Sequence, residues 1–234
     1  LLGMVAYPGF SHVVATAGVI TPDKIKVISG DTENTPYGGG TWASRGTGIG
    51  GEAAAKAGKV LRGNILDVAG ILLQSEPETL DIRNNQVVDN VDGNERMSVA
   101  EIGRIVYYRG DTLPKDFQAE MMAVQHYFPK NYPFAFTNSV HCSHLEVDIN
   151  TGFIKLLKHW AVEDCGTVIN PQSVDDQVRG GVAQGIGGAL YEECLYNDKG
   201  QLLNGNLADY LVPMAVELPD VMAVSYTHLR AHET

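Results

Sequence analysis

The sequence predicts an α+β fold, and three observations support this prediction. An amphipathic stripe over residues 52–73 predicts one long helix. Residues 139–149 and 153–163 have the pattern of two longer strands joined by a short turn. Helical and strand patterns alternate irregularly along the chain, without the repeated strand–helix–strand unit of a doubly wound parallel sheet. No internal repeat and no change in composition divides the chain into domains.

The composition is that of a globular protein, and its charge restricts the class of partner. Hydrophobic residues make up 44% and charged residues 19% of the 234 residues, which is enough for a sizeable core. With 17 Lys and Arg against 28 Asp and Glu, the net charge of -11 argues against nucleic acid and against an anionic membrane. Three widely spaced cysteines form no Cys-x-x-Cys pair, so no disulfide, zinc or iron–sulfur site is predicted. We expect a cytoplasmic protein with no membrane span.

Both ends of the chain look cut, which predicts a fragment of a longer protein. The chain opens at Leu1, and its globular pattern runs to about residue 221. Residues 225–234 show neither helical nor strand periodicity and resemble a translated sequencing adapter. We therefore expect one partial domain over residues 1–224, followed by a non-native tail over residues 225–234.

The remaining elements follow from local patterns. Alternating polar and apolar residues predict strands over 24–29 and 117–127. Two short apolar runs around the Asn84-Asn85 pair predict a hairpin. A capping box from Ser98 to Glu101 predicts a helix over 99–108, and a final helix is expected over about 173–196. Three glycines in the helix over 52–73 each cost about 1 kcal/mol relative to alanine, so that helix needs close packing.

A glycine-rich segment precedes the first long helix. The spacing Gly46-x-Gly48-x-x-Gly51 matches the dinucleotide fingerprint, but no strand leads directly into it, and Asp67 falls inside the predicted helix. A nicotinamide-dependent enzyme is therefore disfavoured. Bare backbone and the N–H groups of a helix N-terminus still suit an anion, with the Ser44 hydroxyl as a further donor. A flexible loop whose glycines only form tight turns is an equally good reading at this point.

A second glycine-rich segment lies in the last predicted helix. Gln177, Gly181 and Gln184 stand at i, i+4 and i+7 and share one helical face. Such a face can approach a neighbour or a flat ligand closely, and its amides suit a polar heterocycle. The alternative is that the glycines serve helix–helix contact and the glutamines lie on a solvated edge. Because a purely structural helix would gain from replacing several of these glycines, we favour a binding role.

Two smaller features are weaker candidates. His141 and His144 suggest a metal site, but side chains at these positions of a strand point to opposite faces. Cys165 follows Glu163 and Asp164, which predicts a raised thiol pKa and no nucleophilic activation. The run Glu163-Asp164-Cys165 follows a strand and could supply a base or a nucleophile, although no histidine partner is recognisable near it in the sequence.

Five motifs in a fixed order carry a family resemblance. They are Asp31-Thr32 with Gly40-Thr41-Trp42-Ala43-Ser44-Arg45, then Glu146-Val147-Asp148-x-x-Thr151-Gly152, Asp164-x-Gly166-x-x-Ile169-Asn170-Pro171, Gln177-x-x-Gly180-x-x-x-Gln184-Gly185-x-Gly187 and Asp209-Tyr210-Leu211-x-Pro213. Over residues 18–223 the chain resembles the second, C-terminal molybdopterin-binding domain of the molybdenum hydroxylases. These are the large subunits of the xanthine dehydrogenase, aldehyde oxidase and carbon monoxide dehydrogenase family.

The resemblance implies a cofactor, a reaction and partners. Molybdopterin, carrying a phosphate or a cytosine dinucleotide, would be held by Thr41, Ala43, Ser44, Gly46, Gln177 and Gln184. The implied reaction hydroxylates an aldehyde, an N-heterocycle or a related small molecule with water, while iron–sulfur and FAD groups on partner subunits of a hetero-oligomer remove the electrons. The family's Gly-Gln-Gly motif and its catalytic glutamate have no counterpart here. We therefore expect no catalytic or metal-binding residue in this chain and no turnover by the chain alone. A non-catalytic structural domain of the same fold is the alternative.

Overall fold

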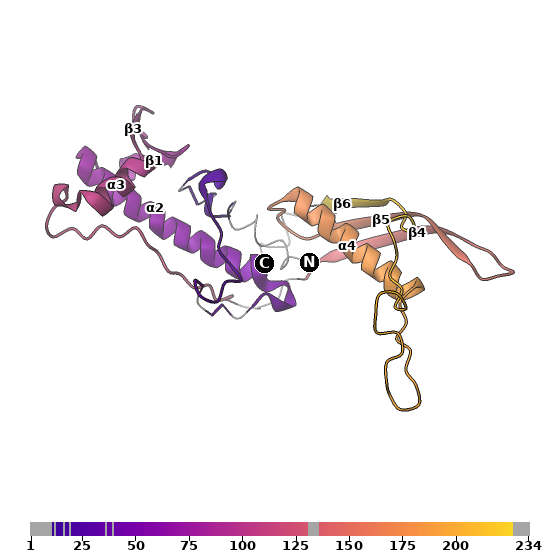
Figure 1. The fold of residues 1–234 in the computed structure, drawn as a ribbon. Helices are drawn as coiled ribbons and strands as arrows, with labels where there is room; N and C mark the ends of the chain where they lie inside the picture. The colour runs from indigo at the N-terminus through magenta and orange to yellow at the C-terminus, as the bar shows by residue number, and fades with distance from the viewer. Residues whose placement is uncertain are drawn as a thin grey trace. The chain divides into compact units, whose positions relative to one another are not determined.

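The computed structural model describes residues 11–226, except for residues 12, 16, 19, 36, 39 and 131–135 and the side chains of Ala43 and Tyr226. The chain forms two compact units, the N-terminal unit over residues 2–135 and the C-terminal unit over residues 136–234. Figure 1 labels the elements of each unit. The expected domain over residues 1–224 thus contains helices and sheets in both units, as an α+β fold requires. Within the described residues, no helix is long and apolar enough to cross a membrane.

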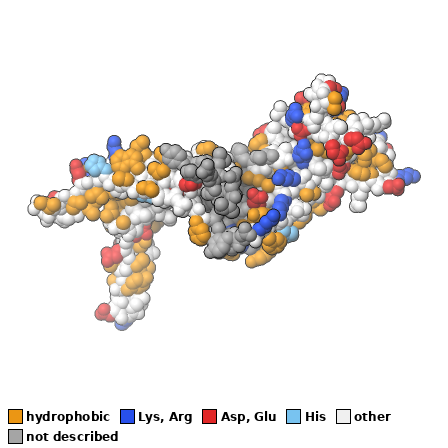
Figure 2. Space-filling view, turned by 180° about the vertical axis from the view of Figure 1, so that it is seen from behind, with side chains coloured by type: hydrophobic (Ala, Val, Ile, Leu, Met, Phe, Trp, Pro, Cys, Tyr) orange, Lys and Arg blue, Asp and Glu red, His pale blue; other side chains and the backbone are white. Residues whose placement is uncertain are grey.

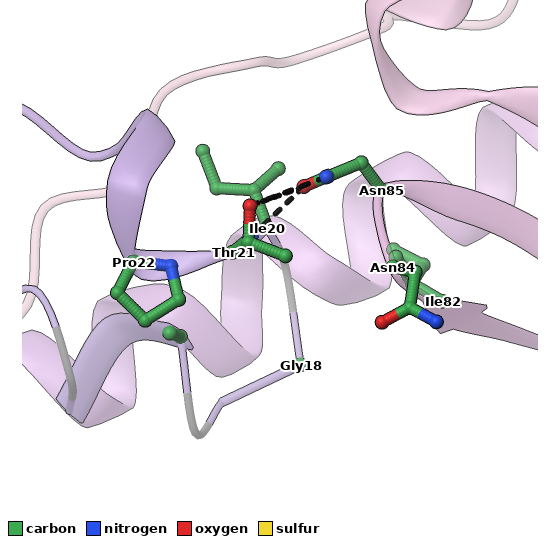
Figure 3. Close-up of a pocket in the computed structure, with 8 residues that line it drawn as sticks. Gly18, Ile20, Thr21, Pro22, Ile82, Asn84 and Asn85 are labelled. Carbon is green, nitrogen blue, oxygen red and sulfur yellow. Dashed lines mark hydrogen bonds between the residues drawn. The ribbon is translucent and has the colours of Figure 1, made fainter.

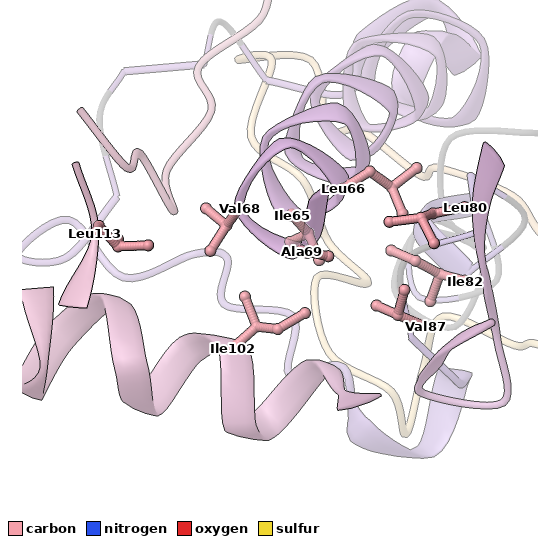
Figure 4. Packing of buried hydrophobic residues seen from close by; sticks show 9 residues of the cluster. All are labelled: Ile65, Leu66, Val68, Ala69, Leu80, Ile82, Val87, Ile102 and Leu113. Carbon is pink, nitrogen blue, oxygen red and sulfur yellow. The ribbon is translucent and has the colours of Figure 1, made fainter. Parts of the chain in front are cut away.

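The N-terminal unit is built on one long helix and a small antiparallel sheet. Helix α2 (Glu52–Leu73) has the predicted bounds, and the sheet has the order β1 (Leu80–Arg83), β2 (Gln86–Asp89) and β3 (Glu95–Ser98). Helix α3 (Val99–Tyr108) follows directly. Buried side chains from α2, both hairpin strands, α3 and the segment after α3 meet in one core, shown in Figure 4: Ile65, Leu66, Val68, Ala69, Leu80, Ile82, Val87, Ile102 and Leu113.

Close packing explains two of the three glycines in α2. A Cβ at Gly58 would lie 2.8 Å from the Cβ of Ala17, and one at Gly70 would lie 2.8 Å from the carbonyl oxygen of Ser75. The helix ends where Gln74 adopts a left-handed conformation with φ of 53°. An ion pair of 2.6 Å between Arg62 Nη2 and Asp81 Oδ1 joins α2 to β1.

The predicted hairpin and helix cap are confirmed at their turn residues. Asn84 and Asn85 have φ of 49° and 66°, the left-handed conformation that a two-residue hairpin turn requires. The Asn85 side chain also accepts a hydrogen bond of 2.8 Å from the backbone N–H of Thr21. Ser98 Oγ accepts from the backbone N–H of Glu101 at 3.1 Å, which caps α3.

The strands predicted over 24–29 and 117–127 are wrong. Neither segment has ladder partners among the described residues, and a short 3-10 helix, η1 (Pro22–Lys24), takes the start of the first. In the second segment the side chains do alternate between buried and exposed. Phe117, Ala119 and Met121 pack on the core, and the residues between them face outward. A segment that covers a helix alternates buried and exposed side chains in the same way as a strand of a sheet. The helix offers that segment no ladder of backbone hydrogen bonds.

The C-terminal unit consists of a three-stranded sheet with one helix across it (Figure 1). Strand β5 (Ile154–Asp164) lies between β4 (Asn138–Val147), which is antiparallel to it, and β6 (Val221–Tyr226), which is parallel. Helix α4 (Pro171–Leu190) buries a stripe at four-residue spacing against the sheet residues Ala161 and Val221. The stripe comprises Val174, Val178, Val182 and Ile186.

Two boundaries of this unit differ from the predicted ones. Helix α4 ends at Leu190 rather than near 196, because the segment after it pairs with Asn204 instead. The Asn204 side chain donates to the Glu193 carbonyl at 2.6 Å and accepts from the Leu195 N–H at 2.9 Å. Strand β6 includes Ser225 and Tyr226, which we assigned to the tail, and residues 227–234 lie outside the described residues.

The segment between α4 and β6 exposes many apolar side chains. Figure 2 shows hydrophobic side chains along it, and Leu203, Leu207 and Val216 are 61%, 82% and 89% exposed. Exposed apolar side chains gathered on one segment are typical of a surface that another part of a larger protein covers.

Candidate functional site

A groove of about 620 Å³ lies between the sheet and α4 within the C-terminal unit. Strands β4 and β5 contribute one wall and α4 contributes the other. Because Ser139 pairs with Glu163 and Leu145 with Leu156, polar residues lie at one end of the sheet wall and apolar residues at the other. Only residues 165–170 connect β5 to α4, so the first turns of α4, with Gln177, lie toward the polar end.

The glycines of α4 are of two kinds. A Cβ at Gly180, Gly181, Gly185 or Gly188 would meet no atom of the described residues within 4 Å, and Gly181 and Gly185 line the groove. Helix–helix contact within the described part of the chain therefore explains none of these four. Gly187 differs, because a Cβ there would collide with the Glu192 carboxylate and lie 3.1 Å from Cδ of Pro213.

The two predicted amides have different surroundings. Gln177 is half-buried and lines the groove together with Gly181 and Gly185. Gln184 is exposed and is not among the residues that line the groove. The groove therefore contains one of the two predicted amides, that of Gln177, and the bare backbone of Gly181. Gln184 lies outside the groove lining.

The segment before α2 is a series of tight helical turns. A 3-10 turn, η2 (Trp42–Ser44), leads into a π-helical turn, η3 (Gly46–Gly51), which continues as α2. Ser44 has φ of 55°, a left-handed conformation that non-glycine residues seldom adopt and that is concentrated at functional sites. Single π-helical turns are likewise frequent at such sites. These turns favour a binding segment over an irregular loop. Thr41 and Ser44 are exposed, and Gly46 is buried.

Ser44 belongs to the N-terminal unit and Gln177 to the C-terminal unit. Their convergence on one ligand therefore stays a prediction.

Four polar side chains on the sheet wall of the groove form a cluster of two hydrogen bonds and one ion-pair contact, which we call the Ser143–Glu163 cluster. Ser143 Oγ lies 2.8 Å from Nδ1 of His159, whose Nε2 lies 3.2 Å from Nδ1 of His141. His141 Nε2 lies 3.4 Å from Oε1 of Glu163. The Glu163 side chain is only 7% exposed, and burial together with the facing His141 lowers the pKa of His159.

Of the two histidines that suggested a metal site, only His141 lines the groove, as expected of side chains on opposite faces of a strand. The histidine partner of Glu163 lies on the neighbouring strand. A regular count back from the turn at residues 150–152 does not find it, because the register shifts between His144 and Leu145. Within the described residues, no group of three or more His, Cys, Asp or Glu side chains suits a metal ion. The pKa of Cys165 is raised as predicted, chiefly by burial and further by Glu163 and Asp164.

A smaller hollow in the N-terminal unit has no such chemistry. It lies between the segment Gly18–Pro22 and the turn of the β1–β2 hairpin (Figure 3). Its polar side chains bond to one another, since Asn85 accepts from both the N–H and the hydroxyl of Thr21. The hollow is therefore a packing feature.

Comparison with known proteins gives a consistent result. A family model described as a molybdopterin cofactor-binding domain matches residues 3–219. The carbon monoxide dehydrogenase large chain of Hydrogenophaga pseudoflava is 30% identical over 210 residues, which cover 90% of this chain and 26% of that one. The nicotine 6-hydroxylase large subunit of Paenarthrobacter nicotinovorans is 32% identical over 228 residues, which cover 92% of this chain and 27% of that one.

A solved structure extends the likeness to the fold. Quinoline 2-oxidoreductase from Pseudomonas putida 86 matches with a TM-score of 0.82 and 31% identity, over 95% of this chain and 28% of that one. The chain thus spans about a quarter of the length of the relatives it matches.

Proposed function

The chain belongs to the molybdopterin cofactor-binding domain family of the molybdenum hydroxylase large subunits, and we propose that it binds the molybdopterin cofactor of such an enzyme. The observation that carries this proposal is the α4 wall of the groove. There the Gln177 amide stands beside two glycines whose missing side chains leave open space. A flat heterocycle with donors and acceptors on its edge fits such a wall, since bare backbone lets it approach closely.

The segment around Ser44 would hold the anionic part of the same cofactor. Backbone N–H groups of a helix start bind phosphate without any Lys or Arg, which agrees with the acidic net charge of -11. We propose Thr41, Ala43, Ser44 and Gly46 as contacts here, for a pterin that carries either a phosphate or a cytosine dinucleotide. Gln184, at the edge of the groove, would support the contact made by Gln177.

The proposed reaction is hydroxylation by water of an aldehyde, an N-heterocycle or a related small molecule. A bound molybdenum cofactor would supply Lewis acidity and an electron sink. This chain's own residues would bind and orient the cofactor, and we assign none of them as the catalytic base. The relatives are named as large chains or subunits, so we propose a hetero-oligomer in the cytoplasm, with iron–sulfur and FAD groups on partner subunits.

Cofactor content tests the proposal. The large subunit that contains this chain would be co-expressed with its partner subunits, and its molybdenum would be measured by mass spectrometry and its pterin by fluorescence. We expect stoichiometric molybdenum and pterin in the wild type and a severalfold loss in Gln177→Ala and Ser44→Gly. The glycine keeps the left-handed conformation at residue 44 and removes the CH2OH side chain with its hydroxyl.

The control is Gln172→Ala, an exposed glutamine in the first turn of the same helix, which should leave the cofactor content unchanged. Wild-type protein without molybdenum would refute the proposal and favour a non-catalytic structural domain. Equal losses in Gln172→Ala and Gln177→Ala would show that the groove is not the binding wall.

A further inference from the structure

The Ser143–Glu163 cluster runs from an exposed hydroxyl to a buried carboxylate. Ser143 is exposed, His159 is 8% exposed and the Glu163 side chain is 7% exposed. Each successive pair of polar atoms lies within 3.4 Å. The cluster therefore links the surface of the groove to its most buried charge, over four side chains from two strands.

The chemistry of the four groups fixes the direction of the hydrogen bonds. An ionised Glu163 carries no proton, so Nε2 of His141, which faces it at 3.4 Å, carries one, and Nδ1 must accept when the ring is neutral. His159 then donates from Nε2 and accepts at Nδ1, where the Ser143 hydroxyl donates. Every donor in the resting state thus points from Ser143 toward Glu163.

We propose that Ser143, His159, His141 and Glu163 form a proton relay that takes up a proton from a weakly acidic O–H or N–H group in the groove and holds it on the His141–Glu163 pair. The bond from that group to its proton breaks, and a new O–H bond forms at Ser143 as the serine proton passes to Nδ1 of His159. The Nε2 proton of His159 passes to Nδ1 of His141. The products are the conjugate base in the groove and a His141 imidazolium beside the Glu163 carboxylate, with no electron transferred.

The surroundings determine where the proton stays. Burial lowers the pKa of His159, so this ring passes a proton on in its neutral form. His141 is the ring that faces the carboxylate, with its Nε2 3.4 Å from Oε1 of Glu163. Among the residues that line the groove, His141, His159 and Glu163 are the titratable ones, and α4 contributes amide, glycine and aliphatic residues. No other charge along the groove therefore competes for the proton.

The relay predicts a linked change in the two rings. When His141 becomes an imidazolium, its Nδ1 turns from acceptor to donor, so His159 must accept at Nε2 and donate from Nδ1 to Ser143. His159 thus changes tautomer while it stays neutral, in the same pH step that charges His141. Two independent histidines would show no such link. The inference stands on the groove's own geometry, so it can be tested on the chain without any cofactor.

Nitrogen-15 NMR of the histidine rings measures this directly. In the wild-type chain we expect the His159 tautomer to reverse in the pH step in which His141 is protonated. Glu163→Gln keeps an acceptor but removes the negative charge that faces His141, so the linked step should move to lower pH. Ser143→Ala removes the hydroxyl that donates to Nδ1 of His159, so both His159 tautomers should be populated before the step, while protonation of His141 still places the His159 proton on Nδ1.

The matched control is His144→Gln, on the same strand but outside the groove, which should leave the linked step unchanged. Ser143 is exposed, so its variant tests the proposal even where the buried Glu163→Gln variant fails to fold. A His159 ring that keeps one tautomer throughout the step would overturn the relay. Because these spectra are recorded without cofactor, that failure is distinct from a lack of bound molybdenum.

Discussion

Replacing the glycines of α4 one at a time should separate binding from packing. Glycine inside a helix costs about 1 kcal/mol relative to alanine, so each Gly→Ala change gains that amount unless the new methyl group meets an obstacle. Gly180 and Gly188 face open space outside the groove, and Gly181 and Gly185 face open space inside it. All four alanine variants should therefore stabilise the C-terminal unit by about 1 kcal/mol each.

Gly187→Ala should behave in the opposite way. The new methyl group would collide with the Glu192 carboxylate, which Tyr210 holds by a hydrogen bond of 2.6 Å. Overpacking of this kind costs about 1–3 kcal/mol. After the gain of about 1 kcal/mol from helix propensity, the free energy of unfolding should fall by about 0–2 kcal/mol.

Urea unfolding followed by tryptophan fluorescence measures these differences. The chain has two tryptophans, so Trp42→Phe leaves Trp160 in β5 as the reporter of the C-terminal unit. Cofactor content of the same variants in the co-expressed large subunit gives the second reading. Gly181→Ala and Gly185→Ala should lose molybdenum and pterin, while Gly180→Ala and Gly188→Ala should keep both.

Two results would refute this reasoning. Full cofactor content in Gly181→Ala would show that no ligand approaches the bare backbone of the groove. A Gly187→Ala protein as stable as Gly188→Ala would show that the Glu192 and Pro213 contacts do not constrain the helix.

Three further predictions concern single hydrogen bonds. The hydrogen bond to Glu192 raises the pKa of the Tyr210 phenol to about 12. In the unfolded chain the same phenol ionises from about pH 10 upward, so the free energy of unfolding should fall between pH 10 and about 12. In Glu192→Gln, NMR should place the phenol transition nearer 10, and an unchanged transition would exclude the carboxylate as the cause. Ser98→Ala removes the cap of α3 and should lower the free energy of unfolding of the N-terminal unit by about 1 kcal/mol, as measured by urea unfolding. An unchanged free energy would show that water replaces the cap fully. Asn85→Gly removes the hydrogen bonding to Thr21 and should lower the free energy of unfolding by about 1 kcal/mol. Asn85→Ala makes the same loss and adds about 1–2 kcal/mol of backbone strain at positive φ. Equal losses in the two variants would show that residue 85 is not strained.

The sequence determined most elements whose signals are local. The bounds of α2 and α3 follow from the apolar stripe and the Ser98 cap, and the β1–β2 hairpin follows from its two asparagines. The strands predicted over residues 24–29 and 117–127 were wrong, because an alternating pattern shows which side chains are covered and not what covers them. The end of α4 depends on Asn204, too far along the chain for any local signal.

One part of the candidate site could be predicted from the sequence, and the other part could not. Gln177 and the bare glycines beside it could be predicted from their spacing on one helix. The Ser143–Glu163 cluster could not be found from motifs, because its bonds join residues up to 22 positions apart, Glu163 pairing with His141, across an antiparallel ladder. It required the register of β4 on β5.

The decisive measurement is a structure of the large subunit with its cofactor bound, determined at atomic resolution. We expect one pterin within hydrogen-bonding distance of both the Gln177 side chain and the backbone N–H groups of residues 41–46. A pterin that contacts only one of these segments, or neither, would contradict this expectation.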